Sequence, residues 1–160
     1  MVSPVIDASP LIFLTKANRL DLLQLSYSRV LVPQVVATEI QQYGAADLTF
    51  QVLQKTQWLV LIQTPSIPQA IQACNLDPGE SAVLSWADHC PGTEAILDDL
   101  AGRRCAQSLG IAIRGTLGLV LAAKKRGQIS AARPVIVELK QAGMYLSNRV
   151  ITQALALVGE

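Results

Sequence analysis

Five acidic side chains stand at positions where a water-facing charge is not expected. Asp7 directly follows a short apolar run, and Asp98 and Asp99 directly follow another. Glu39 and Glu80 lie in segments whose apolar spacing predicts half-buried helices. A carboxylate at the carboxyl end of a buried strand faces the crevice in which open α/β sheets bind ligands. Several carboxylates in one crevice repel one another unless a cation lies among them, so the pattern predicts a metal site.

The ligand types narrow the choice of metal. Carboxylate oxygens favour hard divalent cations, so the expected ion is Mg²⁺ or Mn²⁺. His89 is the only histidine in the chain, which excludes a histidine-rich zinc site.

The elements that must position these acids alternate along the chain. Short apolar runs alternate with segments of helical period, which favours parallel βαβ units in one doubly wound α/β domain spanning residues 1–160. The predicted strands are 2–6, 29–32, 58–62, 94–97 and 111–113. A helix is predicted after Ser9 as its N-cap, broken near Asn18 and resumed through Leu20–Leu23. Further helices are predicted from Pro33 to Gly44 and over 45–55, 77–89, 102–109 and 117–126, with Thr116 as the cap of the last. Two more, at 133–142 and 147–158, the latter with Ser147 as its N-cap, form a helical tail from about residue 130 to 160.

Strand order decides whether the acids meet. If the connection to the fourth strand crosses to the far side of the first, these two strands are neighbours and their shared rim is the switch point of the sheet. Asp7, Asp98 and Asp99 then open on one rim. Helices beside those strands place Glu39 and Glu80 over the same rim.

Composition excludes some classes of protein. Apolar residues make up 51% of the 160 residues and charged residues 16%, which argues against disorder. The formal net charge is only +1, but seven of the thirteen Lys and Arg residues lie between positions 103 and 133. A basic stretch near an acidic cleft suits an enzyme that acts on a polyanion, and a solvated helix face is the alternative interpretation.

Cysteine usage and hydropathy bear on the compartment. The three cysteines, Cys74, Cys90 and Cys105, share no metal-ligand spacing and are expected to be reduced thiols in a cytoplasmic protein. No signal peptide is apparent at the N-terminus, and no apolar run approaches the roughly 18 residues that span a bilayer.

Six short motifs follow one another in a distinctive order along the chain: Ile6–Leu11, Leu20–Leu23, Val32–Pro33 with Glu39, Leu76–Glu80, Leu97–Asp99 and Gly115–Gly118. This ordered set resembles the PIN-domain ribonucleases, and in particular a PIN-related subfamily of uncharacterised bacterial and archaeal proteins. The resemblance covers nearly the whole chain. It implies a three-layer α/β/α fold with a central parallel sheet of four or five strands, and a metal-dependent endoribonuclease activity. Many relatives are toxins of toxin–antitoxin pairs, each inhibited by a small partner protein.

By this resemblance, Asp7, Glu39 and Glu80 correspond to the first three acids of the family's site, and either Asp98 or Asp99 to the fourth. Asp99 is favoured as the fourth by its spacing from the strand. The expected metal ligands are Asp7, Glu80 and one or both of Asp98 and Asp99, and the expected catalytic set is Asp7, Glu39, Glu80 and Asp99. Glu39 or Asp99 would orient the attacking water or accept its proton.

The surroundings of the acids depart from the family pattern at several positions. Ala8 and Leu97 stand where hydroxyl residues are common in relatives, and Leu100 and Ala101 stand where basic residues are common. Ser9 and Thr116 are expected to supply a hydroxyl near the metal instead. Arg103, Arg104 and Lys124 are expected to hold the RNA backbone.

Each acid also has a purely structural interpretation. Asp7 would cap a helix at a strand–helix turn, and Glu39 would be a solvated helix residue. Asp77 and Glu80 fit a capping box, and one of Asp98 and Asp99 would be a helix cap.

A second class of function follows from those structural interpretations. The chain would then be a catalytically weak PIN-like module that binds RNA or protein as a regulator. The apolar face of the segment 147–158 suits an interface, so a homodimer is expected in either case. A flavodoxin-like small-molecule domain is a weaker alternative, since no glycine-rich phosphate loop follows the first strand.

Overall fold

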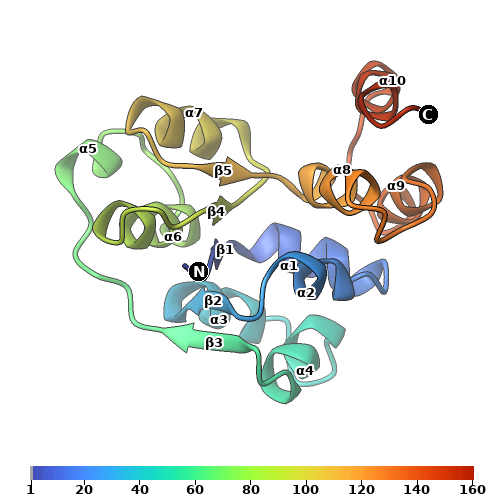
Figure 1. The fold of residues 1–160 in the computed structure, drawn as a ribbon. Coiled ribbons are helices and arrows are strands. Elements are labelled where there is room, and N and C mark those ends of the chain that lie inside the picture. Colours follow the sequence, from blue (N-terminus) through green and yellow to red (C-terminus); the bar gives the residue numbers. More distant parts are fainter. Residues whose placement is uncertain (1) are drawn as a thin grey trace.

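One parallel sheet organises the computed structural model, which describes residues 2–160. Its strand order is β3-β2-β1-β4-β5, and every neighbouring pair is parallel. Helices lie on both sides of the sheet (Figure 1), which confirms the three-layer α/β/α fold. The strands are β1 (Val5–Ile6), β2 (Val30–Pro33), β3 (Leu59–Ile62), β4 (Ala95–Ile96) and β5 (Ile113–Arg114).

The helices follow the predicted order, with one addition. The short helix α5 comes directly after the proline-rich segment 64–68, where no helix was predicted. The helices are α1 (Ala8–Lys16), α2 (Asp21–Ser26), α3 (Gln34–Gln41), α4 (Leu48–Lys55), α5 (Gln69–Gln72), α6 (Pro78–His89), α7 (Leu100–Ser108), α8 (Thr116–Lys125), α9 (Arg133–Gln141) and α10 (Asn148–Leu157).

The neighbouring pair β1 and β4 forms the switch point of the sheet. Val5 pairs with Ala95 and Ile6 with Ile96, and all four side chains are fully buried. The backbone amide of Asp7 donates to the carbonyl of Ile96 over 3.0 Å, so the chain turns away from the sheet directly after this bond. The first and fourth strands are therefore neighbours, which is the condition under which the acids at their ends meet.

Two predicted helix caps are wrong. Ser9 lies inside α1, and Asp7 is the N-cap, because β1 runs into α1 with only one extended residue between them. Gly115, in an extended conformation, is the N-cap of α8, and Thr116 is the first helical residue. The predicted caps Asp77 and Ser147 are confirmed, since their side chains accept from the amides of Glu80 and Val150.

The expectation of three reduced thiols is also wrong. Cys74, just after α5, forms a disulfide with Cys105 of α7, and their Cα atoms are 6.1 Å apart. Only Cys90 is free among the residues the structure describes. The fold brings together two cysteines that are 31 positions apart, a proximity that their spacing in the chain does not reveal. Closing a loop of this length stabilises a fold by about 3–4 kcal/mol in the chain-entropy description.

The C-terminal helices belong to the main core. Leu119 and Val120 of α8 and Ile136 and Leu139 of α9 are buried in the same apolar cluster as β1 and β4. Arg19, just after α1, forms an ion pair with Glu138 of α9 over 2.6 Å. Helix α10 packs beside α8 at the periphery (Figure 1). Within residues 2–160, no helix is long and apolar enough to cross a membrane.

Candidate functional site

Asp7 is the most deeply buried acid at the switch point. It follows β1 as the N-cap of α1, yet its side chain makes no capping hydrogen bond, and the residue is only 6% exposed. Burial, which has the largest effect, and the charges of Asp77, Glu39 and Asp98 together raise the pKa of its carboxyl from 3.8 to about 7, against a hydrogen bond from the Ala8 amide that lowers it. Asp7 is therefore a carboxylate held where its charge is unfavourable.

Glu39 approaches Asp7 across a glycine. A Cβ atom built on Gly79 would lie 2.5 Å from Oε1 of Glu39 and 3.1 Å from Oδ1 of Asp7, so these oxygens from α3 and from the end of β1 face the same point beside α6. Burial and the charge of Asp77 raise the pKa of Glu39, and a hydrogen bond from the Gly79 amide acts the other way. The absence of a side chain at Gly79 is what lets the two carboxylates meet.

Glu80 lies in the first turn of α6 and is 7% exposed. Burial, which has the largest effect, and the charges of Asp77, Asp99 and Asp7 together raise its carboxyl pKa from 4.5 to about 7. The capping box predicted here is present on one side, since the backbone amide of Glu80 donates to Oδ1 of Asp77 over 2.8 Å. On the other side, no hydrogen bond links the Glu80 carboxylate back to Asp77 within the described residues. Helix capping thus uses the backbone of Glu80 and leaves its carboxylate for the cluster.

The structure gives different contacts to Asp98 and Asp99. Both oxygens of Asp98 accept from Thr116, one from the amide and one from the hydroxyl, each over 2.7 Å. Asp99 is the N-cap of α7, but only its Oδ2 accepts, from the amides of Ala101 and Gly102. The second oxygen of Asp99 receives no such bond, and its charge acts on Glu80. Of the two, Asp99 keeps more capacity to bind a cation.

Sequence reasoning assigned Asp77 only to a helix cap, yet Asp77 also belongs to the acidic cluster. Its charge acts on the carboxyls of Asp7, Glu39 and Glu80. The signal was its position three residues before Glu80, at the start of a helix that faces the rim. Gly79, between the two, was missed for a different reason, since only the fold reveals what its missing side chain admits.

The other predicted site residues divide by location. Thr116 is fully buried and donates its hydroxyl to Asp98, whereas Ser9 is exposed on α1. Arg103 lies beside the cluster, because its Nη1 and Oδ1 of Asp98 are 2.9 and 3.1 Å from the same Cβ position on Gly115. Arg104 is exposed on α7. Lys124 is near the far end of α8, where its ammonium group donates to the carbonyl of Ser130 over 2.8 Å.

The carboxylate oxygens of the cluster are ligands that suit a hard divalent cation, but their present positions do not surround one. Asp7, Glu39, Glu80 and Asp99 offer carboxylate oxygens around one rim, and burial with mutual repulsion disfavours charge on three of them. As the side chains stand in residues 2–160, no three of them are arranged so that they could hold an ion. Closure around a cation would require rotation of flexible side chains such as that of Glu39, and would relieve the repulsion.

The sequence is similar to a known protein family. A family model described as a PIN domain matches residues 3–160, nearly the whole chain. No curated protein matches the chain.

The raised pKa of Asp7 predicts a pH-dependent gain from Asp7→Asn in metal-free buffer. Between about pH 4 and 7 the native protein holds a proton on Asp7 that the unfolded chain releases, so stability falls as pH rises through this window. The substitution removes that loss. We expect a gain of about 2 kcal/mol at pH 8, or a melting temperature about 5 °C higher, and a smaller gain at pH 5.

Thermal melts at both pH values in EDTA test this expectation, with Asp88→Asn as the matched control. Asp88 is an exposed aspartate near the other end of α6, and its substitution should leave the melting temperature within about 1 °C. An equal effect of Asp7→Asn at pH 5 and pH 8 would show that the Asp7 carboxyl titrates normally.

Gly79→Ala should separate cation binding from stability. The added methyl group would displace the end of the flexible Glu39 side chain, while alanine suits a helix at least as well as glycine. We expect Mn²⁺ affinity, measured by calorimetry, to fall about tenfold, as for a lost oxygen ligand or its support, with an unchanged or higher melting temperature.

Gly118→Ala is the control for this variant, because its methyl group would meet the Arg114 side chain at 3.2 Å rather than a carboxylate. Equal Mn²⁺ affinity in the wild type and both variants would rule out a role for the Glu39–Asp7 approach in binding a cation.

Proposed function

The chain belongs to the PIN-domain family, whose members are generally nucleases that use divalent metal ions, and on this basis we propose that it is a Mg²⁺- or Mn²⁺-dependent endoribonuclease. The observation that carries the proposal is the convergence of Asp7, Glu39 and Glu80 at the β1–β4 switch point, with the carboxyl pKa of each raised by burial and by neighbouring acids. Structural capping alone supplies no reason for such a cluster.

The residues that would hold the metal are Asp7, Glu80 and Asp99. A divalent cation bound there lowers the pKa of a coordinated water and stabilises negative charge on a phosphate. Glu39 is only partly buried and faces the same point as Asp7, which supports a role in orienting the attacking water and accepting its proton. Its raised pKa brings it closer to the pH at which a general base works best.

Three further residues support this arrangement. Asp98 accepts two hydrogen bonds from Thr116 at the start of α8, so its carboxylate supports the rim and is not free to bind the metal. Arg103, next to Asp98, is the basic side chain closest to the cluster among those proposed to hold the RNA backbone. We assign Lys124 no direct contact with RNA near the cleaved bond, given its hydrogen bond to Ser130.

The proposed partners extend beyond RNA. A small inhibitory protein, as in toxin–antitoxin pairs, and a second copy of the chain remain proposals, as does a cytoplasmic location. Leu61 is an exposed apolar residue on the edge strand β3 and supports association with a second copy.

The competing function is a catalytically weak module that binds RNA or protein. The observation that favours it is the engagement of Asp98 by Thr116, which removes one carboxylate from the set of free ligands. The two functions differ in whether RNA is cut when a divalent metal is present.

Cleavage of a panel of structured RNAs by purified protein, in Mn²⁺ and in EDTA, tests the proposed function. We expect cleavage in Mn²⁺ only, a rate at least about 100-fold lower for Asp7→Asn, and a wild-type rate for Asp88→Asn. The Asp7 variant should remain folded, since it loses an unfavourable buried charge.

Two outcomes contradict the nuclease. Cleavage that persists in Asp7→Asn places the activity elsewhere, or in a contaminant. Well-folded wild-type protein that binds Mn²⁺ and RNA but cuts nothing favours the binding module.

A further inference from the structure

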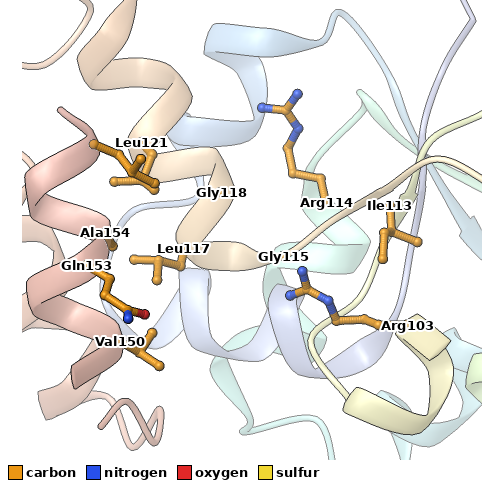
Figure 2. A pocket seen from close by; sticks show the side chains of 11 residues that line it. Arg103, Ile113, Arg114, Gly115, Leu117, Gly118, Leu121, Val150, Gln153 and Ala154 are labelled. Atoms are coloured by element: carbon orange, nitrogen blue, oxygen red, sulfur yellow. The ribbon is translucent and has the colours of Figure 1, made fainter. Parts of the chain in front are cut away.

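A hollow of about 500 Å³ lies between α7, α8 and α10 (Figure 2). Asp98 lies next to it, since Oδ1 of Asp98 is 3.1 Å from a Cβ position on the lining residue Gly115. Arg103 borders it from α7 and Gly115 lies at the start of α8, while Val150 and Gln153 of α10 form the opposite wall. None of the acidic side chains lines this hollow. Its chemistry therefore differs from that of the metal-binding rim next to it.

The net charge of the hollow is positive and comes from one residue. Arg114 also lines it, but its Nε is paired with Glu94 over 3.3 Å. Arg103 forms no ion pair within the part of the chain that the structure describes. Its guanidinium crosses Gly115, and Nη1 lies 2.9 Å from the position that a Cβ on this residue would take. A larger residue at position 115 would therefore occupy the space of the guanidinium. An anion in the hollow would thus meet Arg103 right beside Asp98.

The remainder of the hollow is mainly apolar. Leu117 and Leu121 of α8 face Val150 and Ala154 of α10, and Figure 2 shows Gln153 projecting from α10 into the space between the two helices. The hollow thus presents the guanidinium of Arg103 at one end, an aliphatic wall, and the side-chain amide of Gln153.

We propose that this hollow holds one nucleotide of the RNA strand, next to the bond that the acidic cluster cleaves. The phosphate binds Arg103, the base packs on the wall formed by Leu117 and Val150, and the Gln153 amide bonds the edge of the base. The proposal rests on the proposed function and deepens it, because a base can enter the hollow only when it is unpaired.

Charge and position favour RNA over a protein partner. An amphipathic peptide would use the aliphatic wall, but it would make no use of the acidic cluster next to the hollow. A nucleotide joins a phosphate to a flat, largely apolar ring, which matches a hollow lined by both Arg103 and Leu117, and Asp98 beside Gly115 puts that hollow next to the acidic cluster.

A pair of matched variants tests the site. Val150 and Val137 are 41% and 46% exposed, and only Val150 lines the hollow. Val150→Glu and Val137→Glu therefore make the same charge change at equally tolerant positions. Affinity for a 2′-O-methyl octanucleotide of mixed sequence is measured by fluorescence anisotropy in EDTA, which removes the metal that cleavage requires. We expect Val150→Glu to weaken binding about tenfold and Val137→Glu less than about twofold.

Abasic substitution locates the base. In a series of such oligonucleotides, each lacking the base at one position, we expect wild-type binding to weaken when the base at one particular position is missing. With Val150→Glu, we expect no position at which the missing base weakens binding.

Arg103→Gln should lower the slope of log Kd against log salt concentration by about 0.7, as for one phosphate contact on a single strand.

The failures of this proposal and of the proposed function are distinguishable. If Val150→Glu binds RNA like Val137→Glu, or if its abasic profile equals that of the wild type, the nucleotide site is wrong even where cleavage depends on Asp7. Loss of binding to a protein partner alone, with RNA binding at the control level, would make the hollow a protein-docking groove and overturn the assignment. Cleavage that is independent of Asp7, with RNA binding sensitive to Val150→Glu, would overturn only the nuclease.

Discussion

Repulsion between buried carboxylates at one rim of the sheet is the constraint on which the rest of the structure depends. The β1–β4 pairing fixes the backbone at Asp7 and brings Asp98 and Asp99 to the same edge. Packing of α3 against α6 then adds Glu39 and Glu80. In water these charges would separate, but here the fold holds them close together and buries them. The charged carboxylates are thereby disfavoured, and the pKa values of Asp7 and Glu80 rise to about 7. A bound divalent cation would relieve this repulsion, and the relief would contribute to the affinity of the cation.

Other features of the fold serve to hold this rim in place. The disulfide between Cys74 and Cys105 closes a loop that contains Asp77, Glu80, Asp98 and Asp99, so it restrains both helices that carry these acids. Capping bonds by Asp77 and Asp99 fix the first turns of α6 and α7 through backbone amides. The rim is thus rigid in its backbone, and the carboxylate ends are the parts left to move.

Much of this arrangement was predictable because it depends on local patterns. Apolar runs predicted the approximate positions of all five strands. The acids that follow two of these strands indicated where the switch point lies. Motif order indicated the family, which the match over residues 3–160 confirms. The rest required the fold. The Cys74–Cys105 bond and the approach of Glu39 to Asp7 across Gly79 join distant segments, and the difference between Asp98 and Asp99 depends on side-chain direction after a strand. Neither kind of contact has a signature in the spacing of residues along the chain.

The most direct test of the central claim is a ¹³C NMR titration of the Asp and Glu carboxyl groups, in EDTA and in saturating Mg²⁺. Burial of the cluster, together with repulsion among its carboxylates, predicts that Asp7 and Glu80 titrate near pH 7 without metal. Because Mg²⁺ favours the charged forms, it should move both transitions below about pH 5. Normal titration near the unperturbed values of 3.8 and 4.5 in EDTA, or transitions that Mg²⁺ leaves near pH 7, would contradict a cation site built on carboxylate repulsion.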